Sequence, residues 1–530
     1  YGQSSTYGGQ VVQQASNGST LSLQALASYS RTFNDVHNMD LMAGYESLER
    51  HSEYVEAAGS NLYNPFIPYV GNTIDQPNVG GLRYSYATRG LIFRAKYNYD
   101  SKYFFMGSFR RDASSRFAKD HRWGNFWSVS GAWEIAKENF ATDWTWLDML
   151  KFKASFGQNG NDNLGTSSYG YYYAYTDMYK LTGGNGVWSD ATLYFKGNPD
   201  ISWETSNNFN IGFDYSFLNG KVAGTIEYFN RQTSDMLYFK PTSPSIGYSS
   251  IPMNIGSMRN YGMEFDVNVN IFNTKNIQWD VNANITWAGN KVLKLHPDLN
   301  GEWISGSRIF REGESMYQLY ITKYAGVDPT TGLALYWAKD KQGNEYATTS
   351  GSEAFNTNRV STGNLMPKAY GGFGTDLKAY GFDFSISFAY QFGGKIIDKT
   401  YCQLMYGGNT TYIGQAMHKD LLNAWTPTNT NTDVPRLATS DQYTVYTAAC
   451  DRWLVSSNYL SLNNITLGYT FKKDWVQKLG LQELRIYGAA ENVALWSARK
   501  GLDPRQGYTA SENSTYSPSR TISGGIRVSF

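Results

Sequence analysis

The sequence predicts an all-β fold, namely an antiparallel β-barrel that crosses a membrane with its strands. Stretches of about ten residues alternate between apolar and polar side chains, as membrane-barrel strands do. Aromatic residues make up 16% of the 530 residues and charged residues only 17%, whereas a typical soluble domain has about 25% charged residues. No uninterrupted apolar run approaches the ~18 residues of a membrane-spanning helix. A closed barrel is the other way to satisfy backbone groups in lipid.

The clearest strand is predicted over 382–392. One face carries Phe382, Phe384, Ile386, Phe388, Tyr390 and Phe392, and the other carries Asp383, Ser385, Ser387, Ala389 and Gln391. Strands of soluble proteins average about 5–6 residues, whereas a tilted membrane strand needs ~9–11. The apolar face has no charge, as expected where an Arg or Lys at mid-membrane costs ~2–4 kcal/mol.

Two hairpins repeat this pattern. Residues 263–271 and 277–287 alternate on either side of a turn at 273–276. Residues 209–217 and 222–228 flank the turn 218–221, whose Asn-Gly pair is a strong hairpin signal. Their polar faces carry Asp, Glu, Asn and Gln, which suits a wet or plugged lumen.

The alternation template gives about 15–17 strands over residues 1–530, one of them near 315–326. Four long segments are predicted as extracellular loops, approximately 52–86, 159–200, 340–366 and 394–452. The chain ends on an amphipathic strand whose last residue is Phe530. Such an end resembles the recognition signal of outer-membrane barrels.

The composition and motifs favour no chemistry. The net charge of +1 gives no reason to expect nucleic acid as a partner. The five histidines are scattered without ligand spacing: His37, His51, His121, His296 and His418. No G-x-S-x-G, H-E-x-x-H or P-loop motif occurs, and 340–345 is a polar turn rather than a calcium loop. We therefore predict no catalytic residue, no metal, no cofactor and no enzyme. Cys402 and Cys450 form a disulfide or are two unpaired loop thiols; both readings stay open.

Several blocks in a fixed order resemble the SusC/RagA family of TonB-dependent transporters from Bacteroidetes. Arg110 to Phe117, R-R-D-A-S-S-R-F, is similar to the family's R-R-D-G-S-S-R-F. Further matching blocks lie at 94–99, 123–126, 151–161, 197–205, 254–264, 425–430, 459–469 and 501–504. Two local departures are Ala113, where the family usually has Gly, and Trp127, where it often has Pro.

The resemblance implies a plugged barrel of about 22 strands. We expect residues 1–530 to form the C-terminal part of such a barrel, with its long extracellular loops. The family's carboxypeptidase-like N-terminal extension, its TonB-contacting segment, its plug domain and its first strands are expected to lie outside this chain.

The resemblance also implies active import of oligosaccharides through a multi-pass barrel in the bacterial outer membrane. Its energy would come from TonB-ExbB-ExbD acting on the plug, and a SusD-like surface lipoprotein would close the mouth as a lid. The other implied partners are outer-membrane lipid, a glycan or peptide ligand and, in a dimer, a second SusC–SusD pair. Import of peptides, as in RagA-like members, is the first alternative; a passive porin is the second. A barrel enzyme is disfavoured because no Ser/His/Asp set is clustered.

Aromatic residues of the long loops are the candidate substrate-binding residues. Aromatic faces pair with the C–H faces of sugar rings, while hydroxyls and amides bind sugar hydroxyls. The alternative is that these aromatics form the interfacial girdle or pack the loops together. The candidates are Tyr169, Tyr171, Tyr173, Tyr175, Trp188, Tyr406 and Tyr412.

Overall fold

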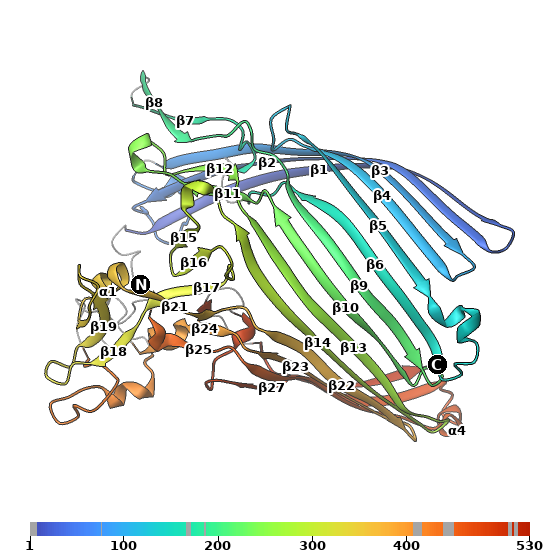
Figure 1. Ribbon diagram of the computed structural model, residues 1–530. Coiled ribbons are helices and arrows are strands. Elements are labelled where there is room, and N and C mark those ends of the chain that lie inside the picture. The colour runs from blue at the N-terminus through green and yellow to red at the C-terminus, as the bar shows by residue number, and fades with distance from the viewer. Residues whose placement is uncertain are drawn as a thin grey trace. The chain divides into compact units, whose positions relative to one another are not determined.

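Long antiparallel strands dominate the computed structural model, which describes residues 8–75, 77–165, 171–184, 187–405, 416–437, 450–506, 511–512 and 518–530. Within these residues one sheet has fifteen strands, and neighbours in the sheet follow their order along the chain (Figure 1). The strands are β1 (Gln10–Phe33), β2 (His37–Ser60), β3 (Asn78–Tyr99), β4 (Tyr103–Ser114), β5 (Trp123–Glu134), β6 (Leu147–Asn161), β9 (Glu204–Phe217), β10 (Val222–Ser234), β13 (Ser257–Asn273), β14 (Ile277–Lys294), β22 (Ala369–Ala379), β23 (Phe382–Phe392), β26 (Tyr459–Thr470), β27 (Glu483–Ser497) and β29 (Thr521–Ser529). The predicted antiparallel all-β architecture is confirmed.

Two compact units can be distinguished along the chain. One comprises Tyr1–Trp133, Lys153–Phe209 and Arg231–Ser257, and the other Glu134–Phe152, Asn210–Asn230 and Met258–Phe530. Each buried cluster and each loop network described below lies within one unit. Among the described residues, no helix combines the length and the apolar character needed to cross a membrane.

The register of neighbouring strands collects the apolar side chains on one face. Phe373 of β22 pairs with Phe388 of β23, and their rings stack with centroids 4.8 Å apart. Phe382 of β23 pairs with Tyr469 of β26 at 4.6 Å. Cross-strand aromatic pairs of this kind stabilise a sheet, and the same register places the polar side chains opposite.

Glycines let tyrosines lie flat on this face. Tyr390 of β23 is in register with Gly371 of β22. Its hydroxyl reaches across that glycine and donates to the carbonyl oxygen of Asn284 on β14, 2.8 Å away. A Cβ on Gly371 would lie only 2.1 Å from that oxygen. An aromatic side chain that covers a strand glycine is a known device for shaping sheets. Close approach of backbone therefore explains why glycine stands here.

Tight turns join the strands at one end. The 218–221 turn is as predicted: Leu218, Asn219 and Gly220 all have positive φ, at 59°, 59° and 74°. The Asp148 carboxylate accepts hydrogen bonds from the backbone of Asn219 at 3.1 Å and Gly220 at 2.8 Å. The predicted turn between β13 and β14 also forms, with Ile277 N donating to the Thr274 hydroxyl at 3.0 Å.

The connections at the other strand ends are long and contain small sheets and helices. These elements are β7 (Met178–Gly184), β8 (Val187–Phe195), β11 (Leu237–Pro241), β12 (Ser250–Asn254), β15 (Glu302–Ser305), β16 (Arg308–Arg311), β17 (Gln318–Thr322), β18 (Tyr324–Val327), β19 (Ala334–Lys339), β20 (Glu345–Thr348), α1 (Gly351–Thr357), β21 (Arg359–Asn364), β24 (Lys395–Asp398), α2 (Lys399–Leu404), β25 (Leu454–Ser456) and β28 (Ser511–Glu512). A further short helix, α4 (Lys473–Gln477), joins β26 to β27.

Two boundaries differ from the sequence prediction. The strand predicted near 315–326 is not part of the large sheet; it is divided between β17 and β18, which belong to two small sheets. Its alternating Leu319 and Ile321 are apolar because they are buried in a loop core. The segment 52–86 is mostly strand, since β2 and β3 leave only 61–77 as a loop. The second half of β2, residues 49–60, is rich in Glu, Ser and Ala. It lacks the continuous apolar face by which the sequence analysis recognised strands.

Candidate binding surface

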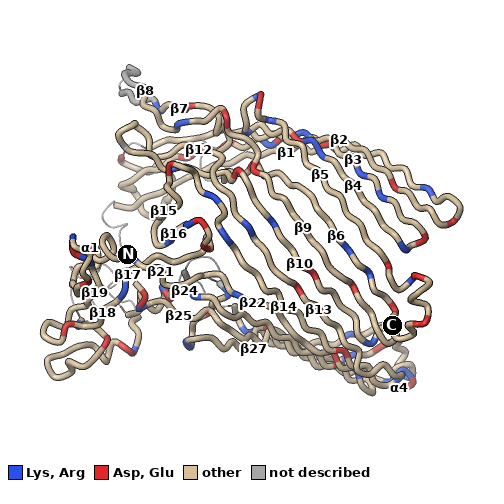
Figure 2. Tube along the Cα trace, viewed as in Figure 1, with Lys and Arg blue, Asp and Glu red and all other residues tan. Residues whose placement is uncertain are grey.

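Ion pairs within a strand and between strands two apart in the sheet lie on the polar face. In β4, Arg110 lies 2.8 Å from Glu46 and 2.7 Å from Asp112. In β27, Arg485 Nε donates to Asp383 of β23 at 3.0 Å. Figure 2 shows these charges spread along the strands rather than gathered in one patch. Such a face is a hydrophilic wall, and these ion pairs balance part of its charge.

A buried arginine organises the long connection that follows β6. Arg116, 5% exposed, donates to the carbonyl oxygen of Asp162 at 3.0 Å and to Asn163 Oδ1 at 2.8 Å. Its guanidinium also lies over the rings of Tyr86 and Tyr172, at 4.9 and 5.3 Å from their centroids. The Asp162 carboxylate accepts the Tyr86 hydroxyl at 2.9 Å. These contacts of the charge, the rings and the backbone thus hold Asp162, Asn163 and Tyr172 against Tyr86 of β3.

The predicted aromatic residues that can be placed serve this packing. Tyr171 lies against Phe239 of β11 at 4.9 Å, and the Tyr173 hydroxyl accepts the backbone N–H of Ser85 at 3.1 Å. Tyr175 packs against the buried cluster of Phe117, Ala174 and Ile201. Trp188 belongs to β8, but its side chain lies outside the described part, as do Tyr169, Tyr406 and Tyr412. Ligand binding by these residues stays a prediction.

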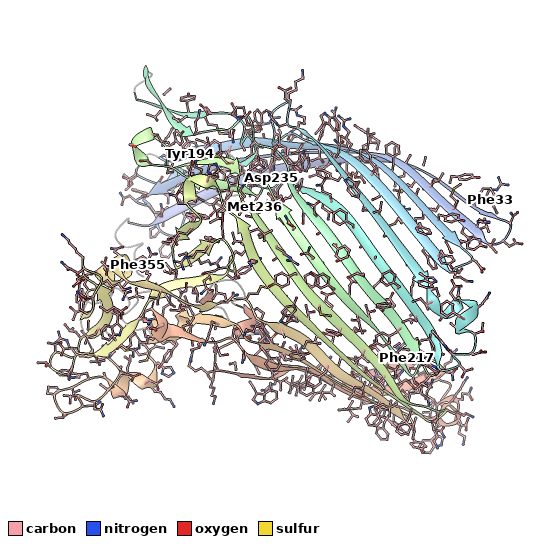
Figure 3. The ribbon with its side chains drawn as sticks, viewed as in Figure 1. Phe33, Tyr194, Phe217, Asp235, Met236 and Phe355 are labelled. Carbon is pink, nitrogen blue, oxygen red and sulfur yellow. The ribbon has the colours of Figure 1, made fainter. Side chains whose placement is uncertain are left out.

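Two other tyrosines of the same connection are open to solvent. Tyr179 of β7 is 58% exposed and Tyr194 of β8 is 64% exposed; Tyr194 is labelled in Figure 3. Tyr179 is part of the tyrosine-rich run visible in the sequence. The sequence analysis did not single out Tyr194. The residue pattern along 187–195 does not show which face of this strand is exposed to solvent and which is packed.

A second loop core forms from residues of 324–354, 397–405, 421–434 and 450–453. Its largest members are Tyr336 of β19, Met405 and Trp453, all at least 90% buried, with Cys402 and Cys450 among them. Both cysteines are buried thiols, and burial raises the pKa of each thiol to about 12. A thiol with so high a pKa is inert at neutral pH. The sequence did not predict this core, since its members are scattered over segments that were predicted as loops or given no structure.

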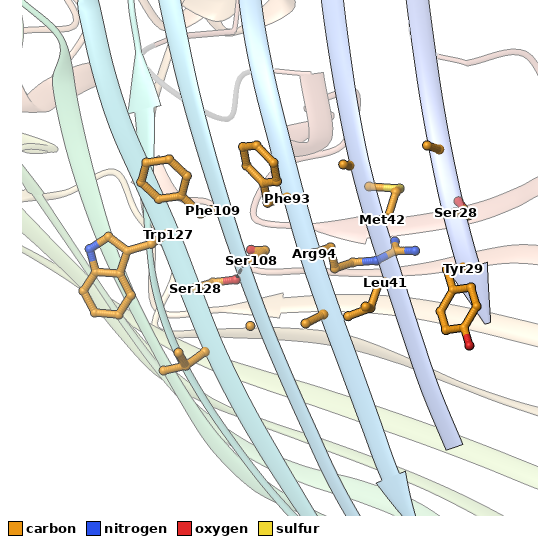
Figure 4. Close-up of a pocket in the computed structure, with 15 residues that line it drawn as sticks. Ser28, Tyr29, Leu41, Met42, Phe93, Arg94, Ser108, Phe109, Trp127 and Ser128 are labelled. Atoms are coloured by element: carbon orange, nitrogen blue, oxygen red, sulfur yellow. Dashed lines mark hydrogen bonds between the residues drawn. The ribbon is translucent and has the colours of Figure 1, made fainter. Parts of the chain in front are cut away.

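A shallow apolar hollow of about 690 Å³ lies on the apolar face of β1–β5, opposite the face that carries the ion pairs. Phe93, Phe109 and Trp127 form one row beside it, and Tyr29 and Leu41 belong to the next row (Figure 4). Ala95 and Gly107 continue this second row, and their small side chains leave the space of the hollow. Large apolar side chains exposed in this way need a non-aqueous neighbour. Over the described ranges, no group of three or more His, Cys, Asp or Glu is placed to hold a metal.

A sheet of long strands with one apolar and one polar face, short turns at one end and folded connections at the other, defines the class of outer-membrane β-barrels. Comparison with known proteins is specific. Residues 1–493 match the family model described as TonB dependent receptor-like, beta-barrel. The chain therefore belongs to the TonB-dependent receptor-like β-barrel family, and it is of the SusC/RagA type. Proteins of this family are transporters of the outer membrane, not enzymes.

The similarity extends over the whole chain. TonB-dependent receptor P3 of Formosa agariphila is 28% identical over 558 residues, covering 99% of this chain and 53% of that protein. TonB-dependent receptor SusC of Bacteroides thetaiotaomicron is 28% identical, covering 88% of this chain and 46% of that protein. The RagAB peptide transporter structure has a TM-score of 0.83 at 26% identity, covering 98% of this chain and 56% of that chain. The chain spans about half the length of the curated relatives it matches.

Proposed function

We propose that this chain forms the C-terminal part of a TonB-dependent importer that carries oligosaccharides across the outer membrane. The observation that carries the proposal is the family match over residues 1–493, joined to a sheet with one apolar and one polar face. The polar face supplies a wetted wall and the apolar face meets lipid. The chain itself performs no chemistry.

The open edges of the sheet support a larger barrel. β1 and β29 are the two ends of the fifteen-stranded order, and open sheet edges do not occur in lipid. Further strands of the whole protein would close the barrel at about 22 strands around a plug. TonB-ExbB-ExbD would act on that plug. A SusD-like lipoprotein would cover the folded loops, and two such transporter–lipoprotein pairs could form a dimer.

The loop aromatics are the proposed sugar contacts. Exposed Tyr179 and Tyr194 join the sequence candidates, because their rings are free to stack on a pyranose face. Tyr171, Tyr173 and Tyr175 would act mainly by holding the connection in shape, given their contacts with other loop residues.

A peptide cargo is the second candidate, favoured by the similarity to the RagAB peptide transporter. Growth of a gene-deletion strain on single glycans and on oligopeptides as the limiting nutrient separates the two. We expect loss of growth on one glycan class, restored by the full-length gene only when TonB is present. Loss on peptides alone would establish the alternative cargo. Uptake that survives without TonB would point to a passive porin.

A further inference from the structure

An arginine stands on the apolar face, where the strands meet the long connections. Arg259 near the start of β13 belongs to the same alternating set as Met263 and Phe265. Its Nε donates to Asn230 Oδ1 at 2.5 Å and its Nη2 to the Tyr228 hydroxyl at 3.0 Å, both on β10. Its guanidinium also lies over the Tyr261 ring, 4.9 Å from the centroid. Neighbouring side chains therefore fix the position of the cation.

The charge of Arg259 is not balanced by the described part of the protein. Arg94 and Arg485 on the polar face each lie beside a carboxylate: Arg94 is 3.2 Å from Asp40, and Arg485 is bonded to Asp383. Within the described ranges, Arg259 has neutral hydrogen-bond partners and no ion pair. A cation held in place without a counter-charge is suited to an anion from outside the chain.

The height of Arg259 on the strand identifies where that anion would be. Ile271 and Tyr261 are ten residues apart on the apolar face of β13. At ~3.4 Å per residue and a tilt of ~40°, they span about 26 Å, which matches the ~25 Å apolar band of such barrels. Arg259 lies two residues farther, about 5 Å beyond the band. It is therefore at the level of lipid headgroups on the side of the long connections.

Aromatic rings mark the same level. Tyr261 contacts Trp287 of β14 edge-on, with centroids 6.0 Å apart, and Trp287 is 46% exposed. Tyrosine and tryptophan gather at membrane interfaces, and their faces can also cover a sugar ring. Only two of the three guanidinium nitrogens of Arg259 are engaged, so N–H donors remain for a phosphate.

We propose that Arg259, Tyr228, Asn230, Tyr261 and Trp287 form a binding site for the phosphate-bearing sugar headgroup of an outer-leaflet glycolipid. The guanidinium binds the phosphate and the rings of Tyr261 and Trp287 contact the sugar. The site depends on the outer-membrane location of the barrel and not on which nutrient the protein imports.

The test is native mass spectrometry of the full-length protein titrated with purified lipopolysaccharide lipid A. Arms with phosphatase-treated lipid A and with phosphatidylglycerol distinguish a phosphorylated glycolipid from any lipid and from any anionic lipid. Arg259→Gln removes the cation, while Lys275→Gln removes the same charge from the exposed turn at the other end of the same strands. Identical heat-modifiability on gels verifies the assembly of each variant.

We expect Arg259→Gln to weaken binding of phosphorylated lipid A about tenfold, the loss of one charge-assisted hydrogen bond. Phosphatase treatment should have the same effect on the unmodified protein, and Lys275→Gln none. Arg259→Lys keeps the charge but not the fork-shaped donor set, so it should bind with intermediate affinity; it replaces Arg259→Gln if that variant does not assemble. Equal affinity for treated lipid A or for phosphatidylglycerol, or full affinity without the arginine, would overturn the proposal.

Discussion

Asp177 shows how a single carboxylate anchors a connection. Lys196 Nζ lies 2.8 Å from its carboxylate, and the backbone N–H of Gly197 donates to it at 2.9 Å. The hydrogen bond from Lys196 lowers the pKa of Asp177 below its ordinary value. At pH values above the unfolded pKa of Asp177, about 3.9, the ionised carboxylate therefore stabilises the ends of the β7–β8 hairpin. That contribution is lost as the pH falls through the lower folded pKa.

We expect hydrogen exchange of 178–195, corrected for intrinsic rates, to accelerate more between pH 5 and pH 2.5 than exchange of the barrel strands. Asp177→Asn should already exchange faster at neutral pH and should lose this acid dependence. An unchanged acid dependence in the Asn variant would show that another group titrates.

Arg116 is a second residue whose removal has a local effect. Arg116→Met deletes two hydrogen bonds and the cation between Tyr86 and Tyr172, so we expect about 2–3 kcal/mol of local destabilisation. Proteolysis within 162–203 should accelerate accordingly. Lys119→Gln, exposed on a neighbouring connection, is the control and should cleave at the unmodified rate; equal rates for both variants would exclude the structural role.

The tyrosines illustrate what residue type alone cannot predict. The run at 171–175 indicated an aromatic surface, but its orientation depends on partners far along the chain, such as Ser85 and Phe239. Tyr84, which stacks on Tyr172 at 4.3 Å, was assigned to a loop. Only the pairing of β2 with β3 places it against that connection.

At the scale of elements, long strands were predictable because their signal is local. Alternation along 382–392 and 263–287 needs no knowledge of the partner strand. The small sheets of 302–364 were not predictable, since strands of four to six residues carry little periodicity. Their apolar residues are buried against Cys402, Met405, Leu421 and Ala424, which lie about 50–90 residues farther along the chain.

Gly371 tests the packing of one strand on the next. A Val side chain there meets the Asn284 carbonyl oxygen, which cannot move without shifting β14. We expect Gly371→Val to destabilise the barrel by about 1–3 kcal/mol, measured as a lower temperature of gel-mobility transition. Gly107→Val is the matched control, because it also lies on the apolar face but has open space around it. Equal transitions for the two variants would refute the close approach.

Tyr336 tests whether the second loop core is an independent unit of stability. It is 1% exposed at the centre of that core. Tyr336→Ala should destabilise the core by about 3–5 kcal/mol, as for other large-to-small changes. We expect faster exchange in 318–357 and 395–405 with an unchanged gel-mobility transition of the barrel. A barrel that loses its own transition would show that the two are cooperative.

At the scale of the whole molecule, the central claim is that one face of the sheet meets lipid and the other water. The ion pairs of the polar face and the aromatic rows of the apolar face both follow from it. So do the proposals of a solvated passage and of a glycolipid site. The closing strands, the plug and the lid belong to the proposed complete transporter, of which this chain supplies the two-faced wall.

A spin-label scan of β23 tests this claim most directly. Cysteines are placed one at a time at 382–392 in full-length protein carrying Cys402→Ala and Cys450→Ala, and reconstituted in bilayers. Collision rates with oxygen should peak at the even-numbered positions, and those with a water-soluble nickel reagent at the odd-numbered ones. Both profiles should have a period of two and opposite phase. Profiles in phase, or without that period, would contradict a strand with one face in lipid and the other in water.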